Sequence, residues 1–280
     1  MRQIEVAQVT QAVKAAAIAA NYEPGADLLA ALIRGFEAEE SPSGKEIFRQ
    51  LLENARIAKE ERIPLCQDCG LAVVFAEVGQ DVHLVGGDFD QAINAGIRQG
   101  YGEGFLRKSL CHPLTRANTG DNTPAIIHTE IVPGDRLKLT VVPKGGGSEN
   151  MSRIAMLKPS QGRQAVREFV VDAVRQAGAN PCPPIIVGIG IGGSLEQACI
   201  LAKKALLRPV GKTNSSDDRL AQMEKELYIR INELGIRPAG LGGKVTTLAI
   251  QAEMMPRHIA SLPVAVNIQC HVARHQEETL

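Results

Sequence analysis

The sequence lacks any apolar run approaching the roughly 20 residues needed to cross a bilayer, which argues against a membrane-spanning chain. The residues after Met1 mix polar and apolar side chains without the apolar core of a secretory signal, so we expect a cytoplasmic protein. The 31 Lys and Arg residues balance 31 Asp and Glu residues, so the chain has no excess positive charge that would indicate binding to nucleic acid. No internal repeat or low-complexity segment is evident.

The composition is that of a globular protein. Hydrophobic residues make up 44% of the 280 and charged residues 22%, which suffices for one large domain or two modest ones. The six cysteines could form three disulfides, but a chain of this length does not need that framework. A reducing compartment would instead favour free thiols or metal ligands.

The first sixty residues have a helical pattern, with Val9, Val13 and Ala17 on one apolar stripe. Ser43 and Glu46 have the spacing of a capping box that would start a second helix. After Pro64 the pattern alternates between strands and helices. We therefore predict a mixed α/β (α+β) fold, with a helical N-terminal segment at 1–60 and a mixed α/β catalytic domain at 61–280, packed as one unit.

Within residues 61–280 the periodicity predicts elements of both kinds. The expected strands are 71–78, 83–86, 126–132, 136–142, 185–191, 245–252 and 258–268, and the expected helices are 89–101, 161–176, 194–207 and 217–234. Pro133-Gly134-Asp135 is a turn signal between two β-rich runs, so we expect a hairpin there.

Three cysteines far apart in the chain lie beside residues suited to metal chemistry. They are Cys66 in Cys66-Gln67-Asp68, Cys182 before Pro183-Pro184, and Cys270 before His271. Three thiolates can hold an iron–sulfur cluster and leave one iron open to substrate, whereas four cysteine ligands are more typical of electron transfer or structure. The pattern allows a catalytic cluster.

Gln67 and Asp68 would place an amide and a carboxylate beside such a metal. A hydration or dehydration needs a group that handles the hydroxyl proton while a Lewis acid withdraws electrons from the oxygen, and Asp68 could be that group. The alternative is a turn in which Asp68 accepts hydrogen bonds from the backbone.

Several other polar residues are candidates for binding. The backbone amides of Gly145, Gly146 and Gly147 could receive a carboxylate, although the same glycines could form a flexible exit from a strand. Arg107 offers a planar fork for a carboxylate, or is a surface arginine. His258 could handle a proton, or is an exposed histidine.

Two other function classes compete with this interpretation. Cys66-x-x-Cys69 permits a redox dithiol or half of a zinc site in an interaction module, although Cys69 could equally be a small buried residue. The run 188–194 matches a dinucleotide fingerprint and permits a nicotinamide-binding protein. Because Arg208-Pro209 breaks the pattern where a Rossmann unit needs its next strand, a glycine-rich strand that lets another backbone approach is the alternative.

The order of these motifs resembles class I fumarase, the oxygen-sensitive iron–sulfur hydro-lyase family that includes tartrate dehydratase. The resemblance covers about residues 40–275. It rests on Cys66-Gln67-Asp68, Leu106-Arg107, Asn118-Thr119-Gly120, the run 144–148, Cys182-Pro183-Pro184, Gly192-Gly193-Ser194, Gly242-Gly243-Lys244 and Arg257-His258 followed by Cys270.

This resemblance implies roles for residues of this chain. Cys66, Cys182 and Cys270 would bind a [4Fe-4S] cluster, whose open iron would act as a Lewis acid. Gln67, Arg107, Gly146 and Gly147 would contact a dicarboxylate substrate. Asp68 and His258 would be catalytic in the reversible hydration of fumarate to malate.

The resemblance also implies a partner. Single-chain relatives continue into another domain that completes the active site, whereas this sequence ends soon after Cys270. We therefore expect the alpha subunit of a two-subunit enzyme, with a fumarase beta subunit in an α2β2 assembly. Ser148 resembles fumarase and favours fumarate as substrate, while Pro159-Ser160-Gln161-Gly162 and Arg208-Pro209 resemble tartrate enzymes and leave an L-tartrate dehydratase alpha subunit as the alternative.

Overall fold

The computed structural model describes residues 2–280 and confirms the mixed α/β class. It divides into two compact units that each combine several stretches of the chain. Unit 1 comprises the chain up to Gly25 together with Asn54–Gly146 and Arg274–Leu280, and unit 2 comprises Ala26–Glu53 and Gly147–Ala273. The boundaries between these units do not fall at residue 60. The division into domains 1–60 and 61–280 remains a prediction.

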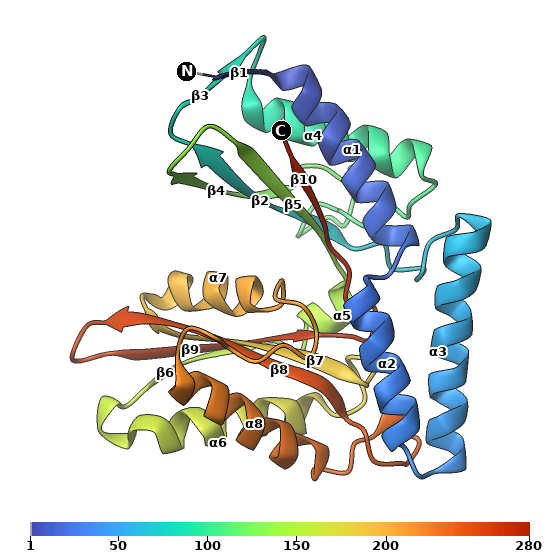
Figure 1. Ribbon diagram of the computed structural model, residues 1–280, viewed down its shortest axis with the longest axis vertical. Coiled ribbons are helices and arrows are strands. Elements are labelled where there is room, and N and C mark those ends of the chain that lie inside the picture. Colours follow the sequence, from blue (N-terminus) through green and yellow to red (C-terminus); the bar gives the residue numbers. More distant parts are fainter. Residues whose placement is uncertain (1) are drawn as a thin grey trace. The chain divides into compact units, whose positions relative to one another are not determined.

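In unit 1 a four-stranded sheet lies against two long helices. The strands follow the order β10-β5-β2-β4, and a separate parallel pair joins β1 and β3. Helices α1 and α4 lie side by side against this sheet (Figure 1). Gly96 of α4 permits this close approach, because a Cβ there would lie 2.7 Å from the Thr10 carbonyl oxygen of α1. The elements are β1 (Arg2–Glu5), α1 (Val6–Tyr22), β2 (Leu71–Gly79), β3 (Val82–Val85), α4 (Phe89–Glu103), β4 (Ile126–Val132), β5 (Leu137–Lys144) and β10 (Gln276–Thr279).

The predicted hairpin of residues 126–142 is wrong, although the turn and both strands exist. Strand β2 lies between β4 and β5, pairing parallel with β4 and antiparallel with β5. Because nearly every residue of β2 is buried, this strand needs neighbours on both sides and packing on both faces. The turn after β4 passes the end of β2, where Gln80 N donates to Val132 O and Gly79 N donates to Arg136 O, both at 2.8 Å.

Unit 2 is a second sheet covered on both faces. Its strands follow the order β6-β9-β7-β8, with α7 on one face and α6 and α8 on the other (Figure 1). The elements are α2 (Ala26–Ala38), α3 (Pro42–Glu61), α5 (Gly146–Glu149), β6 (Arg153–Leu157), α6 (Gly162–Ala177), β7 (Ile185–Gly193), α7 (Leu195–Ala205), α8 (Asp218–Asn232), β8 (Thr247–Arg257) and β9 (Leu262–Gln269). Helix α3 begins in unit 2 and ends in unit 1.

The two sheets share the arrangement of three of their strands. In each, a buried central strand is followed through helical sequence by a parallel neighbour, and the next strand returns antiparallel on the other side. The central strands are β2 and β7. Because no repeat is evident in the sequence, this repetition is one of strand arrangement.

Two local predictions need correction. The strand expected from residue 258 begins at Leu262, because residues 258–261 turn and Ser261 N donates to His258 O at 3.0 Å. The capping box is wrong, because Ser43 lies inside α3 and donates to Leu241 O, while the Glu46 carboxylate contacts Arg49 and Gln50.

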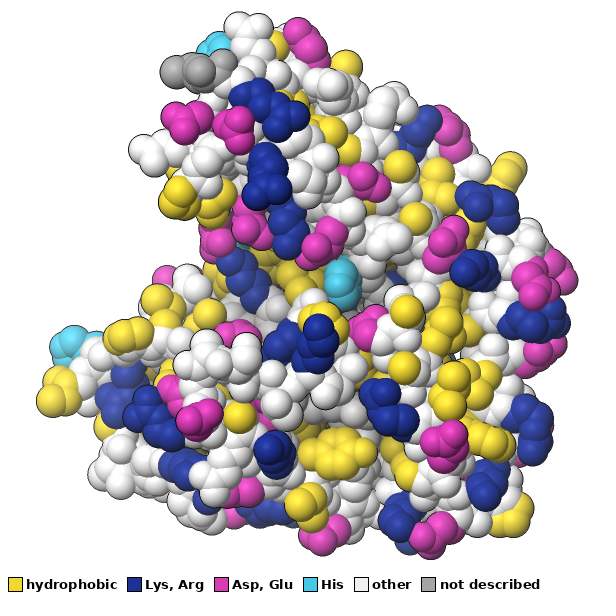
Figure 2. Space-filling view, viewed as in Figure 1, with side chains coloured by type: hydrophobic (Ala, Val, Ile, Leu, Met, Phe, Trp, Pro, Cys, Tyr) yellow, Lys and Arg dark blue, Asp and Glu magenta, His cyan; other side chains and the backbone are white. Residues whose placement is uncertain are grey.

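Over residues 2–280 no helix combines the length and apolarity that a membrane span requires. Basic and acidic side chains are interspersed on the face shown in Figure 2. This distribution agrees with the balanced charge of the sequence.

Candidate active site

In unit 1, the segment before β2 fixes the position of the first predicted ligand. Leu65 is buried, its N–H donates to Asn21 O at 2.8 Å, and its carbonyl accepts from Asn54 Nδ2 at 2.8 Å. Cys66 follows directly and is partly exposed. A residue anchored from two helices thus presents the Cys66 thiol.

The Asp68 carboxylate lies against the glycine-rich run. One oxygen accepts from Gly70 N at 3.0 Å and the other from Gly146 N at 2.8 Å. Gly70 has φ +74°, and a Cβ there would lie 2.7 Å from the backbone of Lys144, so only glycine fits this crossing. Asp68 therefore has the turn role considered as its alternative, and it also joins two segments of the predicted site.

Arg107 contacts the segment that contains Asp68 through its backbone. Its N–H donates to the Cys69 sulfur at 3.1 Å, while its side chain is exposed. Burial raises the pKa of the Cys69 thiol, outweighing the lowering effects of the Arg107 amide and the Arg274 charge. Cys69 is 1% exposed, which confirms its interpretation as a small buried residue.

Three buried residues that the sequence analysis did not select hold the 66–70 loop. The Tyr101 hydroxyl donates to Cys69 O at 2.7 Å and to Gly70 O at 3.1 Å, and Asn122 Nδ2 also donates to Gly70 O. The Arg274 guanidinium donates to Asp68 O and, at 3.3 Å, to Pro143 O. Arg274 lies four residues after Cys270, a nearness in sequence that could have drawn attention to it.

In unit 2, Cys182 and Cys270 lie at the same end of the sheet. Cys182 precedes β7 and Cys270 follows β9, and these antiparallel strands pair Ile186 with Gln269. Both thiols are at least partly exposed. His271, which the sequence analysis left without a role, places Nδ1 3.0 Å from the Cys182 carbonyl oxygen.

His258 lies at the opposite end of that sheet. It follows β8, whose Arg257 pairs with Gly193 at the end of β7, and its side chain is exposed. The nine residues of β7 span roughly 26 Å at about 3.3 Å per residue. Unit 2 of one chain therefore separates His258 from Cys182 and Cys270 by approximately the length of this strand.

The glycines of the dinucleotide-like motif have a packing role. A Cβ on Gly188 or Gly190 would overlap the carbonyl oxygen of Ala202 or Ala198, both in α7. Close backbone approach thus accounts for these two positions, as the alternative reading of the motif anticipated.

Glu149 anchors the end of the glycine-rich run within unit 2. Its carboxylate accepts from Lys203 Nζ at 2.6 Å and from Asn267 Nδ2 at 2.9 Å. Ser148, beside it, is buried. These contacts fix the short helix α5, which begins at Gly146 and contains Gly147.

The chemistry of the predicted cluster ligands fits an iron–sulfur group, because all three are reduced thiols with some exposure. Cys66 belongs to unit 1, whereas Cys182 and Cys270 belong to unit 2. Within residues 2–280, no three His, Cys, Asp or Glu side chains are grouped as metal ligands. The assignment of these cysteines to one cluster therefore remains a prediction.

Known proteins match nearly the whole chain. A family model described as fumarate hydratase (Fumerase) matches residues 10–279. A protein of Methanocaldococcus jannaschii named putative L(+)-tartrate dehydratase subunit alpha is 42% identical over 262 residues, which cover 91% of each chain. An Escherichia coli protein named L(+)-tartrate dehydratase subunit alpha is 33% identical over 242 residues, covering 85% of this chain and 79% of its own.

Proposed function

The chain belongs to the fumarate hydratase (Fumerase) family, and on that basis we propose that it is the alpha subunit of an iron–sulfur hydro-lyase that reversibly hydrates fumarate to malate. Membership confirms the resemblance seen in the sequence. The observation that best supports the site is the grouping in unit 1 of Cys66, Asp68, Gly146 and the backbone of Arg107.

In this proposal the substrate carboxylates bind to exposed groups beside Cys66, Asp68 and Gly146. Gln67 and Arg107 have exposed side chains, which suit them to bind a dicarboxylate. The amides of Gly146 and Gly147 would complete the contacts. Because Asp68 already accepts from Gly146 N, a substrate carboxylate at this amide would compete with Asp68 and release its carboxylate to handle the hydroxyl proton.

Cys66, Cys182 and Cys270 would hold a [4Fe-4S] cluster, leaving Cys69 outside the ligand set because it is buried and bonded to Arg107. When bound, such a cluster supplies an open iron that acts as a Lewis acid on the carbon–oxygen bond. The chain's own residues would orient the dicarboxylate and handle its proton.

The partner proposal rests on the relatives, both of which are named as alpha subunits. We propose a beta subunit that supplies the remaining catalytic groups, in an α2β2 assembly. His258 can act beside Cys182 and Cys270 only if a second copy of the chain contributes it, because one sheet holds these residues at opposite ends. An assembly with two alpha subunits provides that second copy.

L(+)-tartrate dehydration is the second candidate, and the names of the relatives favour it. Both substrates are small dicarboxylates suited to the same residues. Assays of the anaerobically purified two-subunit enzyme with fumarate, malate and L(+)-tartrate distinguish the two candidates. A clear preference for tartrate would replace the proposed reaction while leaving the hydro-lyase assignment intact.

Metal analysis tests the cluster independently of turnover. We expect about four irons and four sulfides per alpha subunit in the complex, and a large loss of both in Cys66→Ser. Cys69→Ser is the matched control, since it changes a thiol three residues away that we place outside the ligand set. Equal iron loss in the two variants would contradict this ligand assignment, and high fumarase activity from the isolated chain would contradict the need for a partner.

A further inference from the structure

Unit 2 contains a cavity of about 700 Å³ that has no part in the proposed hydration. It is lined by α2, by the loop between α7 and α8, by α8 itself, and by β8. Its volume is in the range of small-ligand pockets, which is about 300–1,000 Å³. None of the residues that line it belongs to the proposed active site.

Three cationic side chains surround this cavity, each from a different element. Arg34 comes from α2, Lys212 from the loop and Lys225 from α8. In the described chain, none of the three has an ion-pair partner. Gly211 has φ +92°, and a Cβ there would lie 2.7 Å from Arg34 Nη2, so the glycine lets the loop backbone lie against the guanidinium group.

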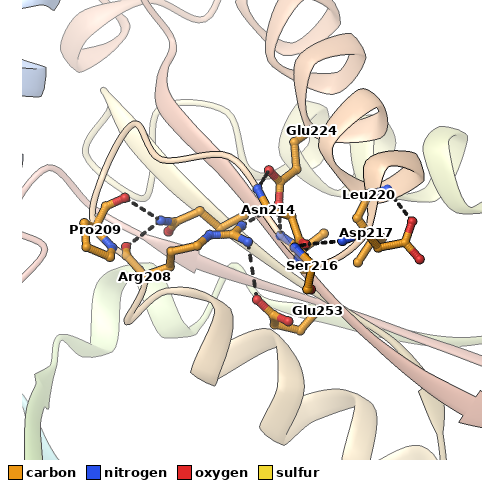
Figure 3. Close-up of polar contacts among 10 residues, drawn as sticks. Arg208, Pro209, Asn214, Ser216, Asp217, Leu220, Glu224 and Glu253 are labelled. Atoms are coloured by element: carbon orange, nitrogen blue, oxygen red, sulfur yellow. Dashed lines mark hydrogen bonds and ion pairs between the residues drawn. The ribbon is translucent and has the colours of Figure 1, made fainter.

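The carboxylate that lines the cavity, and one that contacts a lining residue, are already engaged. Glu224 lines the cavity, but one oxygen accepts from Arg208 and from Ala252 N, and the other accepts from Asn214 N (Figure 3). Asp27 accepts from Val210 N at 2.7 Å. Because the one acidic residue in the lining is paired with Arg208, the cavity carries an excess of positive charge and favours an anion.

The edge of β8 indicates the size of the occupant. Asn232 bonds the backbone of Thr247, while Glu224 and Asn214 bond that of Ala252, so side chains cover this outer edge at both positions. Residues 248–250 between them line the cavity. A gap of three residues is shorter than the usual strand of about five or six, which favours a compact molecule over an added strand.

Apart from Thr213 and Gly211, the remaining lining is apolar and aromatic. Leu248 and Ile250 are almost fully buried, while Tyr228 of α8 is 40% exposed and supplies an aromatic ring for stacking. Three separated cations suit a chain of phosphates better than a single carboxylate. We propose that this cavity binds a nucleoside polyphosphate, with the phosphates among Arg34, Lys212 and Lys225 and the base beside Tyr228.

Isothermal titration calorimetry of ATP into the two-subunit protein, in magnesium-free buffer, tests this site. We expect saturable binding with one ATP per alpha subunit. The double variant Arg34→Gln/Lys225→Gln should bind at least about tenfold more weakly, because it removes two charge-assisted contacts. Lys158→Gln is the matched control: Lys158 is an exposed lysine of unit 2 away from the cavity lining, and its variant should bind ATP as the wild type does.

Tripolyphosphate and Tyr228→Ala separate the contributions of phosphate and base. Tripolyphosphate should bind the wild type more weakly than ATP, and Tyr228→Ala should reduce ATP affinity to that level. Thermal unfolding of the Arg34→Gln/Lys225→Gln and Lys158→Gln variants should match the wild type, because the substituted side chains are exposed. Absence of saturable binding at about 1 mM ATP, equal ATP affinity in the double variant and wild type, or equal affinities for tripolyphosphate and ATP would overturn the proposal.

Discussion

Replacing Glu39 by Gln should destabilise unit 2 through one buried carboxylate. Glu39 is 1% exposed and accepts the backbone N–H groups of Glu40, Ser41, Lys244 and Val245 at 2.7–3.1 Å. It therefore joins the end of α2 to the segment just before β8. A glutamine of the same size can keep only one oxygen as an acceptor, and its NH₂ group would face N–H donors.

The free energy of unfolding should fall by about 3 kcal/mol. One buried N–H donor is left without an acceptor, which costs about 1–3 kcal/mol, and the remaining hydrogen bonds no longer have a charged acceptor. If all 280 residues unfold together, this loss lowers the melting temperature by about 5 °C. If unit 2 unfolds by itself, its smaller unfolding entropy makes the shift about 9 °C.

The effect should depend on pH with a defined sign. Burial raises the pKa of Glu39, but the hydrogen bonds from the Lys244, Ser41, Val245 and Glu40 amides outweigh it and lower the pKa below its ordinary value of 4.5. The stabilisation is therefore fully present above 4.5 and is lost as the pH falls through the lowered value. The difference in free energy of unfolding between wild type and Glu39→Gln should therefore also become smaller as the pH falls.

Urea unfolding at pH 7 and at about pH 4 measures this difference. Glu40→Gln is the matched control. The Glu40 side chain, next to Glu39 in the sequence, is 76% exposed, and its ion pair with Lys244 contributes little to the free energy of unfolding. A Glu39→Gln stability within about 0.5 kcal/mol of the control at pH 7 would refute the reasoning.

Three further predictions concern the 66–70 loop and the thiols. Arg274→Met should accelerate hydrogen–deuterium exchange in residues 66–70, because the guanidinium no longer binds the Asp68 carbonyl; unchanged exchange would show that the loop does not depend on it. Tyr101→Phe should cost about 1–2 kcal/mol in urea unfolding, since the hydroxyl donates to two carbonyls, and a neutral result would contradict this. In metal-free protein, iodoacetamide should label exposed Cys111 well before Cys69, whose burial raises its thiol pKa; equal rates by mass spectrometry would count against that burial.

Local sequence patterns predicted most elements but not their neighbours. Helix α4 begins at Phe89, as its apolar periodicity indicated, with Asp88 capping its first turn. The hairpin of residues 126–142 failed because a turn signal shows where the chain reverses, not which strand lies beside it. The buried run of β2 occupied the central position instead, since an apolar strand gains most from neighbours on both sides.

The candidate residues of unit 1 could be found by motif, but the residues that hold them could not. The sequence places Asp68 beside Cys66, yet its contact with Gly146 joins residues 78 positions apart. Tyr101, Asn122 and Arg274 support the same loop from distant elements. Each is an ordinary residue whose importance depends on a backbone group that only folding brings near.

The sequence by itself determined the mixed α/β class, the family and the cysteine-centred motifs, because these depend on residue types at short spacing. The tertiary structure alone decided that β2 and β7 are central strands, that His258 lies a strand's length from Cys182 and Cys270, and that Glu39 binds amides 205 and 206 residues away. These features depend on burial and on hydrogen-bond partners that meet only after the chain folds.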